Sequence, residues 1–291
     1  MNRLKASKLD LLIYVGPALL LLLGIVYIPI VQTGYFGLME WNGIGQKTFV
    51  GLENYLALLQ DSKFWSSAYH SLILAGASII SLIFYLTISF VLASRIKGAN
   101  LLRKIYLIPM LLASVAIAQL WMKIYNPSNG MLNMFLMKLG FENTPAWLGD
   151  ANLALYAIIV PTIWQYAGFY ILIYYAALKN VPESLVEAAR IDGASSFQIA
   201  LKIKLPLIMN VVKVTIVLAA VGSLKYFDLI YIMTGGGPSG SSEVMASYMY
   251  NTAFNKFDFG YGSAIGFFLL VICLVATFII QRLTIADKDL Y

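Results

Sequence analysis

Long apolar runs alternate with shorter polar stretches along the 291 residues of this chain. The first run, residues 11–31, contains no charged side chain. About 20 consecutive apolar residues are enough for a helix to cross the ~30 Å hydrocarbon core of a bilayer. The pattern predicts six membrane-spanning helices, at residues 11–31, 69–94, 105–125, 153–178, 211–233 and 262–281.

The first run has a rival interpretation as a secretory signal peptide, because Arg3, Lys5 and Lys8 precede it. The apolar core of a signal peptide usually has only ~7–15 residues and ends at small residues suited to cleavage. Here the run is longer and ends in the sequence IPIVQTGYF. We therefore expect an uncleaved helix.

Three polar stretches separate these runs, at residues 39–68, 126–152 and 234–261. In the first, Leu52, Tyr55, Leu56 and Leu59 follow helical spacing, which predicts a short helix along the surface. The second contains Asn-Pro and Asn-Gly pairs, which are typical of turns. We expect the second and third stretches to be loops.

Composition agrees with an all-α integral membrane protein. Hydrophobic residues make up 60% of the chain and charged residues 12%, about half of the ~25% usual in soluble domains. Cys273 and His70 are the single residues of their types, which excludes an intrachain disulfide and a cysteine-based metal cluster. We expect His70 to play a structural role at a helix start. No metal site and no nucleophile–base pair is predicted, so the chain does not read as an enzyme.

Basic residues indicate the topology. Six of the 20 fall on one predicted side or in the outer half of a span: Lys47, Lys63, Lys123, Lys138, Lys225 and Lys256. The remaining 14 of the 20 lie at the termini and after the second and fourth spans. By the positive-inside rule, both termini and residues 181–206 should face the cytoplasm. Topology thus accounts for the net charge of +6, and no nucleic-acid partner is required.

Residues 181–206, VPESLVEAARIDGASSFQIALKIKLP, are too charged for a membrane core. The charges are Glu183, Glu187, Arg190, Asp192, Lys202 and Lys204. Each would cost at least ~2.5–3.5 kcal/mol near the bilayer centre. The stretch is therefore expected in water.

Two short helices are predicted within residues 181–206. Pro182 suits a first helical position, and Gly193 is free to end the first helix in a left-handed conformation. Ser195 and Gln198 have the spacing of a capping box for the second helix, and Pro206 closes it. On these residues alone, a simple connector and a docking surface for another protein are both open.

One spacing pattern runs through this stretch: Glu187-Ala188-Ala189, three residues, Gly193, nine residues, Ile203, one residue, Leu205-Pro206. The pattern resembles the EAA loop of permease subunits of binding-protein-dependent ABC importers. In that family the loop forms coupling helices that dock on a cytoplasmic ATPase. The resemblance implies that Glu187 makes polar contacts with the ATPase, that Ala188 and Ala189 allow close approach, and that Gly193, between Asp192 and Ala194, makes the turn. The expected mode is a helix in a groove.

Four further segments resemble the carbohydrate-uptake branch of this family, which includes maltose and glycerol-3-phosphate permeases: FVGLENY (49–55), NPSNGMLN (126–133), IDGASSFQ (191–198) and FDLIYIMTGGGP (227–238). The resemblance covers essentially the whole chain and implies one permease domain of the type I importer fold in a bacterial or archaeal inner membrane. It implies a second, similar permease, two ATPase subunits and an external solute-binding protein as partners. ATP and magnesium would bind the ATPase, because this chain has no Walker motif and is expected to bind no cofactor.

A substrate pathway is predicted on two spans. Thr162, Gln165, Tyr166 and Phe169 share one face of the fourth span, and Gly222, Ser223 and Tyr226 share one of the fifth. Aromatic rings stack on sugar faces, and hydroxyl and amide groups meet sugar hydroxyls; members of the resembled family bind sugar between these two helices. Helix packing is the alternative, because small and hydroxyl residues are common at interhelical contacts.

Lys225 and Asp228 lie three residues apart in the outer half of the fifth span and are candidates for an ion pair, a gate or an interface anchor. Lys225 leaves open an anionic substrate such as glycerol-3-phosphate beside a neutral sugar. An ion-coupled secondary transporter is a weaker alternative, since Asp228 is its one modest carboxylate candidate. Gly235-Gly236-Gly237 lacks the spacing of a phosphate-binding loop and reads as a flexible external turn.

Overall fold

The computed structural model describes residues 8–94 and 98–285. The charges at residues 3, 5, 95, 97 and 288, on which part of the topology prediction rests, lie outside the described residues. The described chain forms two compact units, one built from residues up to Asp61 together with Met249–Val271, the other from Ser62–Tyr248 and residues from Ile272 onward. Each unit is described separately.

The first unit begins with an apolar helix in three segments, α1 (Lys8–Leu22), a π-helical turn η1 (Leu23–Tyr27) and α2 (Ile28–Phe36). A two-stranded antiparallel hairpin follows, in which β1 (Met39–Glu40) pairs with β2 (Thr48–Phe49). The remaining elements are α3 (Glu53–Gln60), a second π-helical turn η3 (Asn251–Asn255) and the first part of α15 (Phe259–Ile285).

Helix α3 is the surface helix predicted from Leu52, Tyr55, Leu56 and Leu59. Leu58 is fully buried, whereas Leu56 and Leu59 are exposed. The Tyr55 hydroxyl donates to the carbonyl of Gly34 at 2.9 Å. The Asn54 side chain also donates to the carbonyls of Gly37 and Met39 at 3.1 and 2.9 Å. One buried leucine and these side-chain hydrogen bonds thus hold α3 within the first unit.

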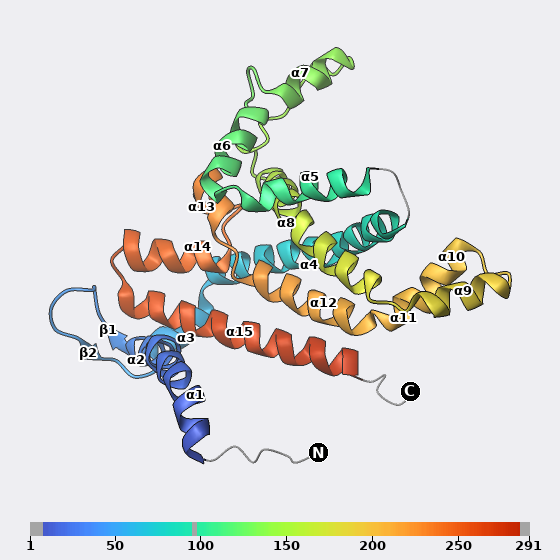
Figure 1. Ribbon diagram of the computed structural model, residues 1–291. Helices are drawn as coiled ribbons and strands as arrows, with labels where there is room; N and C mark the ends of the chain where they lie inside the picture. Colours follow the sequence, from blue (N-terminus) through green and yellow to red (C-terminus); the bar gives the residue numbers. More distant parts are fainter. Residues whose placement is uncertain (1–7, 95–97, 286–291) are drawn as a thin grey trace. The chain divides into compact units, whose positions relative to one another are not determined.

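The second unit carries every residue of the predicted functional sites (Figure 1). Its elements are α4 (Ser62–Ala93), α5 (Ala99–Leu111), α6 (Ser114–Ile124), α7 (Met131–Lys138), α8 (Ala154–Lys179), α9 (Glu183–Ile191), α10 (Ser196–Ile199), π-helical η2 (Ala200–Lys204), α11 (Leu205–Leu207), α12 (Met209–Leu224), α13 (Asp228–Met233) and α14 (Met245–Tyr250), which continues into the first unit.

Helices α4, α8 and α12 form the centre of this unit, and hydrogen bonds join each pair of them. The Tyr85 hydroxyl of α4 donates to the carbonyl of Ile163 in α8 at 2.6 Å. Tyr174 of α8 meets Thr215 of α12 at 2.6 Å, and Ser223 of α12 donates to Ser78 of α4 at 2.7 Å. In an apolar surrounding, where helices gain little from the hydrophobic effect, such bonds and close packing hold helices together.

Within the described residues, five helices are long and apolar enough to cross a membrane, and a bent helix pair makes a sixth candidate, in agreement with the predicted all-α membrane fold. The third predicted span, 105–125, is not a single straight helix. Its two halves, α5 and α6, meet at 99°, because Leu112 and Ala113 adopt extended backbone conformations. Hydropathy averages over a window and cannot detect such a bend.

The fifth predicted span, 211–233, is also interrupted. Helix α12 ends at Leu224 and α13 begins at Asp228, with three non-helical residues between them. The second span is longer than predicted, because α4 starts at Ser62 and not at residue 69. Residues 62–68 are too polar to be recognised as part of a span, yet they form the first turns of α4.

The two expected loops contain helices. Met131–Lys138 forms α7, and Met245–Tyr250 with η3 makes a helical segment in the third polar stretch. The turn before α7 matches its sequence signal: the Asn126 side chain accepts from the backbone N–H groups of Ser128 and Asn129 at 3.0 and 3.1 Å. Asn133, fully buried, then accepts from the Trp147 indole at 2.7 Å, so polar side chains fix this segment.

His70 lies in the first turns of α4 and has the structural role predicted for it. Its Nδ1 is 2.8 Å from the carbonyl oxygen of Glu243. A carbonyl only accepts, so Nδ1 must carry the proton in this contact. The neighbouring Ser71 accepts from the Met245 backbone N–H at 3.1 Å, and together the two contacts attach the segment before α14 to α4.

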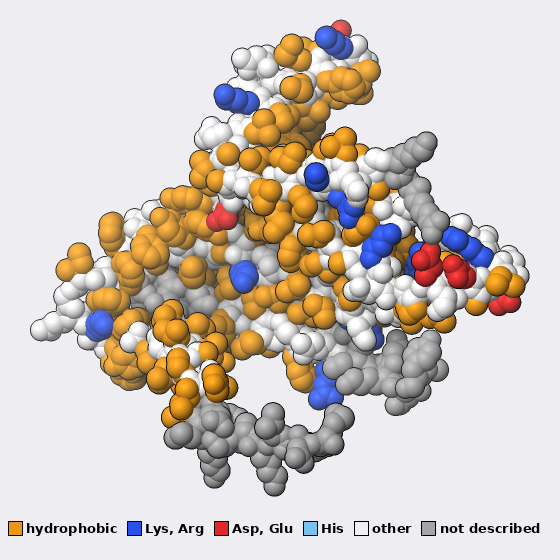
Figure 2. Space-filling model, viewed as in Figure 1, with side chains coloured by type: hydrophobic (Ala, Val, Ile, Leu, Met, Phe, Trp, Pro, Cys, Tyr) orange, Lys and Arg blue, Asp and Glu red, His pale blue; other side chains and the backbone are white. Residues whose placement is uncertain are grey.

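Hydrophobic side chains dominate the face of the molecule seen in Figure 2. Leu111 is 80% exposed and Ile83 69% exposed. Large contiguous apolar surface is rare on soluble monomers and is suited to lipid or to partner helices. Acidic side chains, by contrast, gather over α9 and the turn that follows it (Figures 1 and 2).

Candidate functional site

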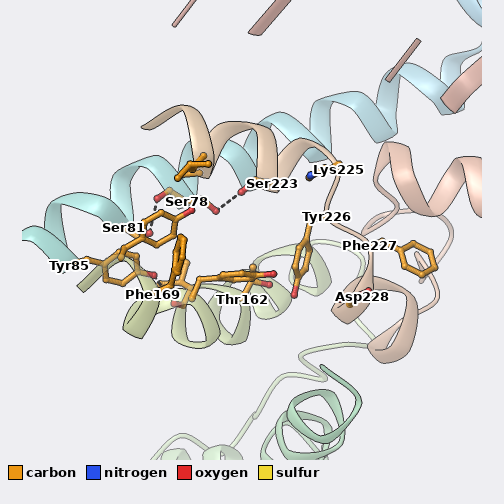
Figure 3. Close-up of a pocket in the computed structure, with 16 residues that line it drawn as sticks. Ser78, Ser81, Tyr85, Thr162, Phe169, Ser223, Lys225, Tyr226, Phe227 and Asp228 are labelled. Atoms are coloured by element: carbon orange, nitrogen blue, oxygen red, sulfur yellow. Dashed lines mark hydrogen bonds between the residues drawn. The ribbon is translucent and has the colours of Figure 1, made fainter. Parts of the chain in front are cut away.

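A cavity of ≈ 340 Å³ opens between α4, α8 and α12, next to the break between α12 and α13 (Figure 3). The cavity wall includes the residues of the break and the first residue of α13, Lys225, Tyr226, Phe227 and Asp228. The cavity is thus a product of the interrupted helix and of the three helices that surround it.

Most of the predicted pathway residues line this cavity. They are Thr162, Tyr166, Phe169, Gly222, Ser223 and Tyr226, together with Lys225 and Asp228. Helical spacing placed the residues of each helix on one face, and the packing of α8 against α12 with the break after α12 brought the whole set together. The cavity wall carries both rings and hydroxyl groups, the mixture that the prediction required.

Gln165 is the exception among the predicted residues. It is only 7% exposed and does not line the cavity. Its Oε1 accepts from the Tyr226 hydroxyl at 3.3 Å, and its Nε2 donates to Ser114 Oγ at 3.5 Å. The amide is therefore hydrogen-bonded behind the wall, and Gln165 does not line this cavity with the other residues of its stripe.

Helix α4 supplies lining residues that the sequence analysis missed. Ser78, Ser81 and Tyr85 face the cavity, and Tyr170 of α8 joins them. The α4 residues recur at i, i+3 and i+7, so a polar stripe on the second span was the available signal. The Tyr85 and Tyr170 rings stack with centroids 5.8 Å apart and planes 4° from parallel.

Lys225 and Asp228 form no ion pair in the described part of the chain. Both are exposed, and they stand on opposite sides of the helix break. The Asp228 carboxylate instead accepts from Ser114 Oγ at 3.2 Å. One positive and one negative charge therefore stand at the cavity wall without neutralising each other directly.

The second candidate site is the hairpin of residues 181–206, called the α9–α10 hairpin below. Its turn closes α9 by two hydrogen bonds, from Gly193 N–H to the Arg190 carbonyl at 3.1 Å and from Ala194 N–H to the Ala189 carbonyl at 2.9 Å. Gly193 has φ +80°, the left-handed conformation that this Schellman closure needs. The helix–glycine–helix prediction is confirmed in this detail.

The predicted capping box is also present. The Ser195 side chain accepts from the Gln198 backbone N–H at 3.3 Å, and Gln198 Oε1 accepts from the Ser195 N–H at 2.8 Å. The second helix then continues through η2 and α11 to Leu207. Local sequence chemistry therefore determines the hairpin at both sides of its turn.

The hairpin has a small core of its own. Val186, Ala189 and Ile199 are buried in it, with Ala194 and Ile203 packed against them. Ala188 and Glu187 point outward, so of the two alanines predicted to allow close approach only Ala188 lies on the surface. The Ala189 side chain is part of the hairpin's core.

Two large apolar side chains flank the turn in full exposure. Ile191 is 87% exposed and Phe197 72% exposed, on a segment that is otherwise charged. Behind them, burial and then the neighbouring charges of Lys179 and Arg190 lower the pKa of Lys204. The hairpin thus presents apolar tips to its surroundings and concentrates positive charge at its base.

Comparison with known proteins gives a consistent result. A family model described as the binding-protein-dependent transport system inner membrane component matches residues 86–284. The probable ABC transporter permease protein YurN of Bacillus subtilis is 34% identical over 288 residues, covering 97% of this chain and 98% of its own length. The trehalose/maltose transport system permease protein MalF of Thermococcus litoralis is 34% identical over 275 residues, covering 94% and 92%.

Solved structures show the same fold. A chain of a bacterial alginate ABC transporter in complex with an alginate pentasaccharide-bound periplasmic protein superimposes with a TM-score of 0.83 over 95% of each chain, at 22% identity. A second structure of a bacterial importer of alginate gives a TM-score of 0.84 at 23% identity, covering 97% of this chain and 98% of that one.

Proposed function

We propose a transport mechanism from one premise: this chain belongs to the family of inner membrane components of binding-protein-dependent transport systems. It is therefore the multi-pass permease subunit of an ABC importer and is not itself an enzyme. Its substrate, its contacts with partners and the orientation of its termini are the subject of the proposal.

The proposed substrate is a sugar or oligosaccharide, which crosses the membrane through the cavity between α4, α8 and α12. The observation that carries this is the lining, which contains the rings of Tyr85, Tyr166, Phe169 and Tyr226 together with hydroxyl groups. A sugar offers apolar ring faces and a rim of hydroxyls, and it matches such a wall better than a compact ion or a purely apolar ligand does. Sugar transport by relatives such as the trehalose/maltose permease supports the same class.

The α9–α10 hairpin is proposed to carry the coupling to ATP hydrolysis. Its apolar tips, Ile191 and Phe197, would enter a groove on a cytoplasmic ATPase, and Glu187 with Asp192 would make polar contacts at the rim. Two ATPase subunits, a second permease and an external solute-binding protein would complete the importer. ATP and magnesium would bind to the ATPase subunits, and both termini of this chain would lie in the cytoplasm.

Closure of the ATPases would then move the hairpins together and turn the cavity from one side of the membrane to the other. Such alternating access requires helices that transmit motion as rigid bodies. The compact core of the hairpin, with its capped second helix, suits that role.

The direct test is uptake by the complete complex, reconstituted with its ATPases and solute-binding protein. Radiolabelled maltose, trehalose, chitobiose and xylose are presented with ATP inside the vesicles. We expect ATP-dependent accumulation of at least one sugar, and Phe169→Ala should reduce it about tenfold or more, because a stacking ring is lost from the cavity. Accumulation that persists without ATP and collapses with an ionophore would instead identify a secondary transporter.

A variant of Lys225 can distinguish a neutral from an anionic substrate, because Lys225 is the cation in the cavity wall. We expect Lys225→Met to leave maltose uptake within about twofold, since an exposed charge contributes little to binding a neutral ligand. Uptake of glycerol-3-phosphate is measured in parallel. If the wild-type complex accumulates the phosphate and the variant does not, the anionic alternative is correct.

A further inference from the structure

Four side chains around the cavity form one hydrogen-bonded chain. The Tyr226 hydroxyl donates to Gln165 Oε1 at 3.3 Å, Gln165 Nε2 donates to Ser114 Oγ at 3.5 Å, and Ser114 Oγ donates to Asp228 Oδ2 at 3.2 Å. Every donor points the same way, and the chain ends on a carboxylate, which only accepts. We call these four residues the relay.

The relay joins residues of two kinds. Tyr226 and Asp228 line the cavity, whereas Gln165 and Ser114 do not. Figure 3 shows the Tyr226 ring extending from the end of α12 toward α8. The two residues behind the wall therefore hold the two residues within it.

The relay also joins the two helix breaks of the second unit. Ser114 is the first residue of α6, directly after the 99° bend, and Asp228 is the first residue of α13, directly after the gap that follows α12. Helices α6 and α13 pack against each other, with Ile117 beside Leu229 and Ile230 in one apolar cluster. Gln165 lies in α8, which is continuous, and hydrogen-bonds to Tyr226 at one break and to Ser114 at the other.

We propose that Gln165 and Ser114 are positioning residues, which set the Tyr226 and Asp228 side chains and so tie the shape of the cavity to the geometry of the two helix breaks. Backbone hydrogen bonds from Lys225 N–H to the Val221 carbonyl at 3.3 Å and from Tyr226 N–H to the Ser223 carbonyl at 3.1 Å close the end of α12, and the relay adds a side-chain restraint to segment 225–227. Gln165 and Tyr226 are each 7% exposed, so a group left without its partner there would be costly. This inference rests on the proposed function only in taking the cavity as the substrate's.

The test measures how accessible the cavity wall is to a reagent, and it needs no knowledge of the substrate. In a Cys273→Ala background, Ser81→Cys places a thiol in the cavity wall on α4, outside the relay. Its labelling rate by a small methanethiosulfonate reagent is measured on the full-length chain in its complex in membranes. Gln165→Leu removes the hydrogen bond of about 1 kcal/mol that restrains Tyr226, and Ser114→Ala removes the bonds that hold Gln165 and Asp228. Adding either substitution should raise the rate about five- to tenfold.

Controls distinguish positioning from general damage. Ser114→Thr keeps the hydroxyl and should keep the original rate. Ser67→Ala removes a buried hydroxyl whose bond stays within α4, and it should have no effect. The double variant Gln165→Leu/Ser114→Ala should label no faster than the faster single variant, because both cut one chain.

Two outcomes overturn the inference: a rate that stays at the Ser67→Ala value in both single variants, or a double variant in which the two effects multiply. If Gln165→Leu fails to assemble, the half-buried Ser114 supplies the decisive pair of variants. Sugar uptake by the same complexes separates the two proposals. If no sugar accumulates in the wild type, the proposed substrate class fails, while the labelling rates still decide the relay.

Discussion

Replacing Gly193 by proline should abolish coupled uptake while the chain still inserts in the membrane. Proline fixes φ near −65° and has no N–H, whereas Gly193 stands at φ +80° and donates to the Arg190 carbonyl. The cost is about 3 kcal/mol or more, which lowers the population of the folded turn roughly 100-fold. Sugar accumulation and ATP hydrolysis by the complete complex are measured together, and we expect hydrolysis to continue without uptake.

The matched control is Gly140→Pro. Gly140 has φ +94°, and its N–H donates to a helical carbonyl at 3.0 Å, so the local strain is similar, but the residue follows α7 and lies outside the hairpin. Uptake should survive in that variant. Gly193→Ala, which strains φ but keeps the N–H, should give an intermediate loss. Normal uptake by Gly193→Pro would remove the hairpin from the coupling mechanism.

Gly168→Ala should destabilise the second unit. At Gly168 the backbones of α5 and α8 meet so closely that an added Cβ would lie 2.8 Å from the Tyr106 carbonyl carbon and 2.9 Å from Leu107 Cα. These atoms belong to backbone and cannot turn away, so α5 must shift. Overpacking of this kind costs about 1–3 kcal/mol, and we expect the melting midpoint of the purified complex to fall by about 6 °C or more.

Gly76→Ala is the control for this prediction. Gly76 lies within α4, and an added Cβ there meets nothing within 4 Å. Its midpoint should equal or exceed that of the wild type, because alanine is the better helix former. Equal midpoints for the two variants would show that α5 and α8 do not cross at Gly168 as described.

The sequence was most informative where local chemistry is sufficient. Apolar run lengths located the spanning helices, and the spacing of Gly193, Ser195 and Gln198 determined the turn and the capping box. These features depend on residues within a few positions of one another. The stripes on α8 and α12 were predicted for the same reason, since helical periodicity alone decides which residues share a face.

The tertiary structure decided what periodicity cannot resolve. The polar side chains of Thr162 and Gln165 lie on the same stripe, yet Thr162 faces the cavity and Gln165 turns to Ser114. That partner lies 51 residues away in sequence, beyond a bend that leaves the hydropathy pattern unchanged. Likewise Ala188 and Ala189 are neighbours in sequence, but the hairpin's own core takes up only Ala189.

By itself, then, the sequence determined the membrane class, the helical spans and the turn and capping box of the α9–α10 hairpin, because each follows from local composition and spacing. Only the tertiary structure placed α4 in the cavity wall, interrupted the third and fifth spans and placed Gln165 behind that wall. Those features depend on which helices pack together, and residues far apart in the chain supply the contacts that decide it.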